Sequence, residues 1–204
     1  MGKGGYRMAK TEWKGSTLLA PLPVALVTSA DGDKQNVFTV AWTGIVCSHP
    51  PKLYISVRPE RYSFDLIAKS REFVLHPATK ALAKATDGCG IYTGKKVDKF
   101  QKYKLGTEPA NHVSAPLLAD APLAFECRVS DIIPLGSHHM FLADILSVDV
   151  DESLLDENGK LCMERADLIS FSHGEYVALG KKLQGFGGSV KKKKSPQKSP
   201  KGSK

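Results

Sequence analysis

The chain has 204 residues, of which 42% are hydrophobic and 25% are charged, and this balance fits one globular domain with or without an appendage. No apolar run approaches the roughly 18 residues that a membrane span needs, and the first 15 residues lack the apolar segment of a secretory signal. Four widely spaced cysteines without a C-x-x-C pattern indicate neither a disulfide framework nor a zinc knuckle, so we expect a cytoplasmic protein.

The net charge of +8 is concentrated at the C-terminus. Residues 191–204, "KKKKSPQKSPKGSK", contain seven lysines and no acid, and removing these seven charges leaves +1 for the rest of the chain. Such a composition cannot bury a core, so we expect a disordered tail. The tail is either a plain solvated terminus or an arm for nucleic acid or an anionic membrane. Nucleic acid is the less favoured partner, because no aromatic residue is interleaved with the lysines and the body is nearly neutral.

Short apolar runs alternate with turn signals along the body. In chain order, strands are expected at 22–29, 36–42 and 43–47, then at 52–58 and 72–76, and later at 122–133, 138–151, 168–172 and 176–180. Helical spacing is expected at 64–69, 78–87 and 96–103. The run at 138–151 is apolar on both faces, as in a strand of a closed barrel.

The predicted fold is therefore mainly β, a β-barrel with a few inserted helices. We assign residues 1–14 to an N-terminal extension, 15–190 to the barrel domain and 191–204 to the lysine-rich tail.

A group of cationic and hydroxyl side chains lies at the end of the strand "KLYISVR". Side chains alternate along a strand, so Ser56 and Arg58 share one face. Pro59 keeps the strand extended to its end. Arg61 and Tyr62 follow in the turn, and Ser63 is expected to cap a helix that begins at Phe64. Two guanidinium groups, two hydroxyls and a helix N-terminus suit a phosphate dianion.

Two simpler interpretations stay open at this point. Arg58 and Arg61 could instead pair with the nearby carboxylates Glu60 and Asp65. The phosphate could also belong to several kinds of ligand, but the sequence has neither the G-x-x-x-x-G-K-[ST] pattern nor a G-x-G-x-x-G pattern after a strand. No spacing of histidines or acids indicates a metal.

The block "NVFTVAWTGIVCSHPPKLYISVRPERYS" resembles the flavin reductase-like family of FMN-binding split barrels, and within it the flavoredoxin branch. The resemblance extends to "DKF" at 98–100, "APLAFECRV" at 121–129, Gly136 to His138, "DESLLDENGKL" at 151–161 and "LGKKLQGFGGSVKK" at 179–192. It implies a split barrel, an FMN cofactor and a homodimer that holds FMN near the subunit interface. His49 and His76 depart from the family pattern and could alter the edge of the flavin pocket.

The resemblance also implies roles for individual residues. Ser56, Arg58, Arg61 and Ser63, with Tyr62 beside them, would hold the FMN phosphate. Ala41, Trp42, Thr43 and Gly44 would present backbone donors to the polar edge of the flavin ring, which tunes its potential. The Trp42 side chain could instead be core, and Cys47 could line the pocket. His138 matches a family position over the flavin face, although a structural histidine is equally compatible with the sequence. Tyr92, Lys99 and Tyr176 are weaker candidates for the rim.

Two functions follow from the resemblance. The first is an NAD(P)H:FMN oxidoreductase, in which a hydride passes from nicotinamide to FMN. The second is a flavoredoxin-type electron carrier, with tightly bound FMN, protein redox partners and no nicotinamide site.

Overall fold

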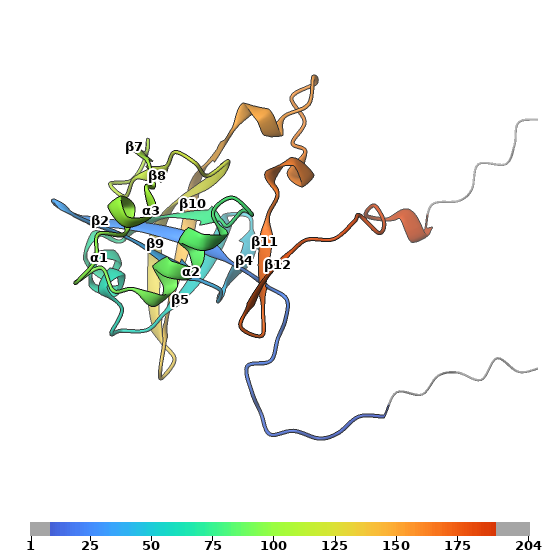
Figure 1. The fold of residues 1–204 in the computed structure, drawn as a ribbon, viewed down its shortest axis with the longest axis horizontal. Coiled ribbons are helices and arrows are strands. Elements are labelled where there is room, and N and C mark those ends of the chain that lie inside the picture. Colours follow the sequence, from blue (N-terminus) through green and yellow to red (C-terminus); the bar gives the residue numbers. More distant parts are fainter. Residues whose placement is uncertain (1–8, 191–204) are drawn as a thin grey trace, which may run out of the picture.

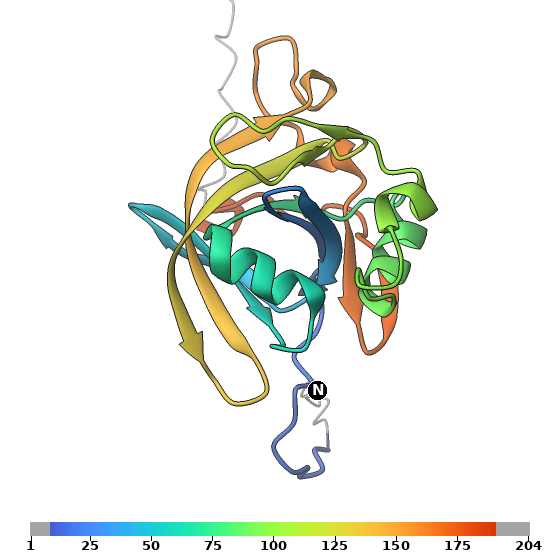
Figure 2. The same ribbon diagram turned by 90° about the vertical axis from the view of Figure 1, so that its left-hand side faces the viewer.

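The computed structural model describes residues 9–190, and the predicted tail at 191–204 lies outside the described residues. Seven strands form one antiparallel sheet in the order β3-β2-β6-β9-β10-β5-β4. Their bounds are β2 (Ala25–Asp31), β3 (Lys34–Val40), β4 (Thr43–Ser48), β5 (Pro51–Val57), β6 (Glu72–Pro77), β9 (Leu123–Pro134) and β10 (His139–Val150). The sheet curls into a barrel (Figures 1 and 2), which encloses the barrel core, one of four hydrophobic clusters among the described residues.

Alternation along the strands explains this core. In β5, Leu53, Ile55 and Val57 are buried, and in β3, Phe38 and Val40 point to the same interior. Phe141 of β10 and Phe73 of β6 lie in that interior with no exposed surface. The mainly β prediction is confirmed.

The barrel is split and not closed. The outer strands β3 and β4 each pair with one strand among the described residues, and they are joined directly through Ala41 and Trp42. The prediction of a closed-barrel strand at 138–151 is therefore wrong for its second half. Leu146 and Val148 of β10 are exposed there, because only the first half of β10 lies between two barrel strands.

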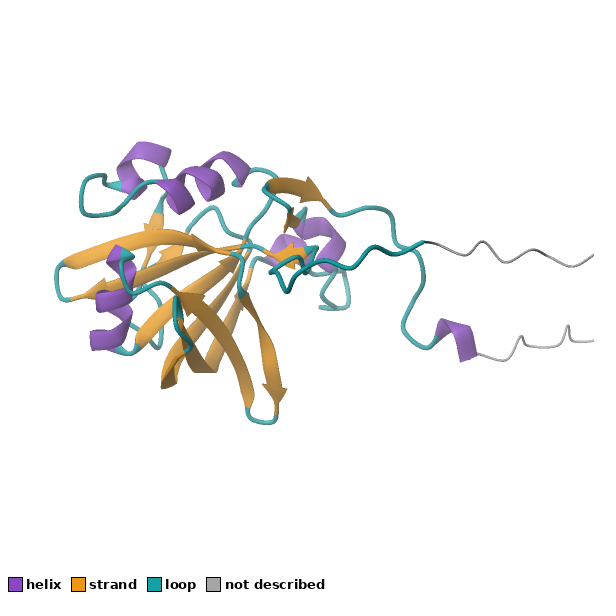
Figure 3. Ribbon diagram, turned by 90° about the horizontal axis from the view of Figure 1, so that it is seen from below, coloured by secondary structure: helices purple, strands orange, loops and turns teal. Residues whose placement is uncertain are grey.

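Three helices decorate the barrel. The helix α1 (Tyr62–Ser70) lies across one opening and packs Ile67 into the core (Figure 2). The helices α2 (Ala83–Ile91) and α3 (Lys99–Tyr103) lie outside the sheet, with α2 packed on Leu26 and Val37 (Figure 3). Both begin later than predicted, at 83 instead of 78 and at 99 instead of 96. Thr79 pairs with Leu168, and this contact holds the segment before α2 in a turn.

Short elements complete the chain. They are β1 (Leu22–Pro23), β7 (Thr107–Glu108), β8 (Leu117–Leu118), β11 (Ile169–Ser172), β12 (Glu175–Ala178), and the 3-10 turns η1 (Glu152–Leu154), η2 (Met163–Ala166) and η3 (Gly188–Val190). The predicted strand at 22–29 is divided at Val24, because β1 pairs with β11 while β2 pairs with β3 and β6. Within the described range, no helix has the length and apolar character to cross a membrane.

Candidate functional site

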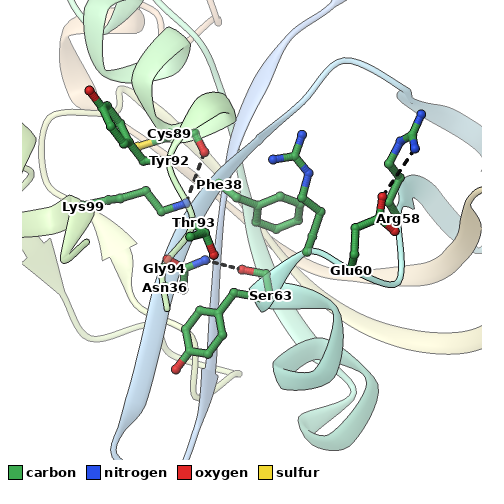
Figure 4. A pocket seen from close by; sticks show the side chains of 12 residues that line it. Asn36, Phe38, Arg58, Glu60, Ser63, Cys89, Tyr92, Thr93, Gly94 and Lys99 are labelled. Carbon is green, nitrogen blue, oxygen red and sulfur yellow. Dashed lines mark hydrogen bonds and ion pairs between the residues drawn. The ribbon is translucent and has the colours of Figure 1, made fainter. Parts of the chain in front are cut away.

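A cavity of about 420 Å³, which we call the basic cavity, lies where β3, the start of α1 and the α2–α3 connection meet (Figure 4). It is lined by Asn36, Phe38, Arg58, Glu60, Arg61, Tyr62, Ser63, Cys89, Tyr92, Thr93, Gly94 and Lys99. Three of these side chains are cations and one is a carboxylate, so the cavity favours an anion.

A second, smaller cavity of about 170 Å³ adjoins the basic cavity and shares Phe38, Arg58 and Arg61 with it. We call it the tryptophan cavity. Its remaining lining residues are Thr39, Val40, Ala41, Trp42, Ser56, Val57 and His138. Trp42 and Ser56 also line a third, mostly apolar cavity of about 310 Å³ with Thr17, Leu19, Leu22 and Tyr54. The three cavities thus lie next to one another, and their lining changes from cationic in the basic cavity to mostly apolar in the third.

Strand β5 and helix α1 bring the predicted cradle together, as the alternation in "KLYISVR" indicates. Ser56 lies opposite Met140 in the ladder between β5 and β10, and its backbone N–H donates to the carbonyl of Trp42 at 2.9 Å. Ser56 and Arg58 both line the tryptophan cavity, and Arg58 also reaches the basic cavity. The predicted strand is confirmed as far as Val57, and Arg58 follows directly after the end of β5.

The prediction that Ser63 caps a helix starting at Phe64 is wrong. Helix α1 begins at Tyr62, its N-cap residue is Arg61, and no side chain makes the capping hydrogen bond. Ser63 lies inside the first turn with 1% of its surface exposed. Its hydroxyl faces strands β2 and β3 instead of the helix's own backbone, because both strands supply donors there.

A buried hydrogen-bond network fixes the Ser63 hydroxyl. The side-chain amide of Asn36 donates to Ser63 Oγ at 2.8 Å (Figure 4). Ser29 Oγ also donates to Ser63 Oγ, at 2.9 Å. Ser29 and Asn36 are themselves buried. A hydroxyl oxygen has two lone pairs and one proton. Ser29 Oγ also lies 3.5 Å from the Asn36 carbonyl, so Ser29, Asn36 and Ser63 form one buried polar cluster at the wall of the basic cavity.

The two arginines are held differently. Arg58 Nη1 lies 3.4 Å from Glu60 Oε1, and both side chains are about half exposed or more. The simpler interpretation of Arg58 as the partner of Glu60 thus describes an interaction that the structure contains. Arg61 Nη1 donates to the carbonyl of Gly90 at 2.8 Å, which aims its guanidinium at the end of α2. Asp65 makes no ion pair with Arg61 among the described residues.

Lys99 is the third cation and, unlike the arginines, it is buried, with 2% of its surface exposed. Its Nζ donates to the carbonyl of Cys89 at 3.1 Å (Figure 4). Burial lowers the pKa of Lys99 to about 8; the neighbouring Cys89 opposes this shift and Arg61 adds to it. The predicted rim candidate is therefore part of the cavity wall, and Tyr92 lines the same cavity.

Trp42 and His138 form a pair at the tryptophan cavity, with ring centroids 4.4 Å apart. Partial burial and the nearby cations Arg58 and Arg61 hold the pKa of His138 below its usual range. His139 points the other way and packs edge-on against Phe64, as expected for neighbours on one strand. The imidazole and the indole, whose planes are tilted by 39°, together form a partly apolar wall of the tryptophan cavity.

Four candidates line neither the basic nor the tryptophan cavity. Thr43 is buried and donates to the carbonyl of Tyr54 at 2.6 Å, and Gly44 lies against the Tyr54 ring. Cys47 is half-buried on β4, opposite Lys52. Tyr176 packs on Phe171 of the neighbouring strand β11.

The two unusual histidines also lie elsewhere. His76 is fully buried, with Nδ1 3.2 Å from the carbonyl of Leu26, while its Nε2 accepts from the N–H of Leu118 at 3.0 Å. His49 precedes a cis proline in the exposed hairpin between β4 and β5. Neither histidine lines the basic or the tryptophan cavity, and their effect on the edge of a flavin pocket stays a prediction.

Sequence reasoning missed Asn36, Phe38, Cys89, Thr93 and Gly94. A Cβ at Gly94 would clash with the side chains of Asn36 and Tyr62, so this glycine lets the α2–α3 connection close against β3. A polar Asn36 beside an apolar strand segment was the available signal, because a buried amide needs a partner. Between residues 9 and 190, no three His, Cys, Asp or Glu residues are grouped so that they could hold a metal ion.

Comparison with known protein families finds the flavin reductase-like domain across residues 18–177. Among solved structures, flavoredoxin of Desulfovibrio vulgaris (Miyazaki F) superposes with a TM-score of 0.83 at 32% identity, covering 90% of this chain and all of that one.

Two sequence relatives illustrate the range of the similarity. An uncharacterised protein of Pyrococcus abyssi is 28% identical over 170 residues, covering 83% of this chain and 97% of its own length. An NADPH-flavin oxidoreductase of Streptomyces viridifaciens is 28% identical over 137 residues, covering 66% of this chain and 70% of its own.

Proposed function

Since the chain belongs to the flavin reductase-like domain family, we propose that it binds FMN in the basic and tryptophan cavities and works as an NAD(P)H:FMN oxidoreductase. The observation that carries this proposal is that Arg58, Arg61, Lys99 and the hydroxyl-bearing Ser63 line one cavity. A phosphate monoester is close to a dianion at pH 7 and has three acceptor oxygens.

The residues of the basic cavity fit that phosphate. Arg58 and Arg61 can each offer two parallel N–H donors, which match two phosphate oxygens. Lys99 adds a positive charge from a buried position, where its attraction to an anion is less screened by water. Ser63 supplies a hydroxyl that is held in place by Asn36 and Ser29.

The tryptophan cavity fits the ring end of the same cofactor. Ala41 and Trp42 line this cavity. We propose that the backbone N–H groups of residues 41–44 donate hydrogen bonds to the polar edge of the flavin ring. When bound, FMN supplies a ring that takes up a hydride or electrons from a donor. The protein's part is to hold this ring and orient the donor. His138, which lies against Trp42 and whose pKa is held below its usual range, is suited to orienting a planar ring by contact.

We also propose a homodimer. Trp42 and Leu19 are exposed apolar side chains that line the apolar cavity, and Ile45 and Val46 are exposed on β4; a second copy would cover them. The FMN ring would then lie close to the subunit interface.

A second candidate function is an electron carrier of the flavoredoxin type. It is favoured by the 32% identity to a flavoredoxin over nearly the whole chain. In that case FMN would stay bound and exchange electrons with protein partners. Anaerobic mixing with NADH or NADPH separates the two functions, because rapid bleaching of the flavin absorbance is expected only of the oxidoreductase.

FMN binding is tested with Arg58→Ala. A hydrogen bond to a charged group contributes about 1.5–3 kcal/mol, so FMN should bind about tenfold to a hundredfold more weakly. Riboflavin, which has the ring but no phosphate, should lose much less. Both flavins are titrated into apo wild type and apo variant by fluorescence. An equal loss for both flavins, or no loss for either, would contradict the assignment of the phosphate to the basic cavity.

A further inference from the structure

The buried lysine of the basic cavity is suited to more than charge attraction. Lys99 is the first residue of α3, and α3 packs beside β3 with the amine directed at the carbonyl of Cys89. It takes part in no ion pair with a carboxylate among residues 9–190. A buried ammonium that lacks a carboxylate partner gives up its proton more readily than an exposed one.

The amine is therefore nucleophilic near neutral pH. Its pKa of about 8, lowered mainly by burial, leaves roughly a tenth of Lys99 uncharged at pH 7, against less than about a thousandth for an ordinary lysine. The neighbouring Lys95 and Lys96 are exposed. Of these three lysines, Lys99 is the one that lines the basic cavity beside Arg58, Arg61 and Ser63.

We propose that Lys99 is a covalent modification site for small phosphorylated aldehydes. The phosphate would be held by Arg58, Arg61 and Ser63, and the aldehyde would lie in the same cavity, which Lys99 also lines. The proposal takes the phosphate-binding role of the cavity from the proposed function, and it adds a competing class of ligand that would block FMN.

The chemistry is an imine condensation and needs no oxidant or reductant. The lone pair of the uncharged amine forms a bond to the carbonyl carbon, and the carbonyl π electrons move to oxygen, which takes up a proton. The resulting carbinolamine loses its hydroxyl group as water, with both amine hydrogens leaving nitrogen over the whole sequence. One C=N bond replaces one C=O bond, and water reverses the reaction.

The test uses pyridoxal 5′-phosphate as the probe with the full-length apo protein. Borohydride traps the imine as a stable secondary amine, and peptide mass spectrometry reads the position. At limiting probe, we expect labelling of Lys99 at least about tenfold faster than of Lys95 or Lys96. Pyridoxal, which lacks the phosphate, should label Lys99 about tenfold less. Lys99→Arg keeps the charge and should lose the adduct.

Labelling of Lys99 no faster than of Lys95 and Lys96, or equal labelling by pyridoxal, would overturn the proposal. FMN added beforehand should protect Lys99 and leave Lys95 and Lys96 unprotected. Selective, phosphate-dependent labelling that FMN fails to block would support the modification site while contradicting the placement of FMN. Tight FMN binding with no adduct on Lys99 would overturn the modification site alone.

Discussion

Arg58 is paired with Glu60 at 3.4 Å in the wall of the same cavity that gathers Arg61 and Lys99 (Figure 4). A bound phosphate and the Glu60 carboxylate would thus compete for the guanidinium of Arg58. Backbone hydrogen bonding, together with the interaction with Arg58, holds the pKa of Glu60 below its usual range, so the carboxylate is charged at neutral pH. Glu60 therefore weakens the binding of any anion in the basic cavity.

We therefore expect Glu60→Gln to tighten FMN binding about two- to fivefold, in the range of an exposed ion pair. Affinity for riboflavin should stay unchanged. Asp65→Asn is the matched control, because it removes the same charge from the exposed side of α1 and Asp65 lines neither cavity. Equal tightening by both variants would point to overall charge and not to release of Arg58.

A second prediction concerns Asn36, which donates to Ser63. Asn36→Leu has nearly the same volume but removes that donor, so Ser63 is no longer fixed. FMN affinity should fall about three- to tenfold, and riboflavin affinity should not. In a Ser63→Ala background, Asn36→Leu should have no further effect, since the two residues act through one hydroxyl.

The control for Asn36 is Thr28→Val. Thr28 is equally buried, on the neighbouring strand β2, and its hydroxyl donates to the carbonyl of Pro116 at 2.6 Å, away from the cavity. Thr28→Val should lower the free energy of unfolding without changing the ratio of FMN to riboflavin affinity. A similar change of that ratio in Thr28→Val would show that Asn36 acts only through stability.

A third prediction follows from the pKa of Lys99, about 8. A bound phosphate dianion favours the protonated lysine, so FMN affinity should fall by up to about tenfold per pH unit above pH 8. The fall ends where the pKa of Lys99 in the complex is reached. Lys99→Arg should remove this dependence while keeping the charge. Titrations between pH 7 and 9.5 measure it, and a riboflavin profile as steep as that of FMN would refute it.

A fourth prediction concerns stability and His76. Complete burial lowers the pKa of His76 to about 4, and the hydrogen bond to the Leu26 carbonyl opposes this shift only in part. The unfolded chain, with a histidine pKa near 6.5, binds the proton first as pH falls, so acid destabilises the folded protein between about pH 6.5 and 4. From pH 7 to 5 the loss attributable to His76 is about 2 kcal/mol.

Urea unfolding at pH 7 and pH 5 checks the histidine prediction. His76→Gln offers a hydrogen-bond donor and an acceptor without a titratable group. The free energy of unfolding of this variant should therefore fall by about 2 kcal/mol less than that of wild type between pH 7 and pH 5, whatever its stability at pH 7. The same loss in wild type and variant would assign the acid sensitivity to other groups.

The sequence alone determined the strands, because the pattern of apolar and polar residues that predicts a strand lies within the strand itself. The alternation in β5 placed Ser56 on the face opposite Leu53, Ile55 and Val57, because a strand turns each successive side chain to the other face. The apolar runs gave the strands of the barrel for the same reason.

Only the tertiary structure decided which residues from other elements lie beside Ser56, Arg58 and Ser63. Asn36, Ser29 and Lys99 reach the cradle from β3, β2 and α3, and their distances depend on how the barrel curls and how the α2–α3 connection closes at Gly94. Ser63 shows the difference most clearly. Its sequence position predicts a helix cap, but burial against two strands offers its hydroxyl stronger partners, and a hydroxyl follows the donors and acceptors that packing brings to it.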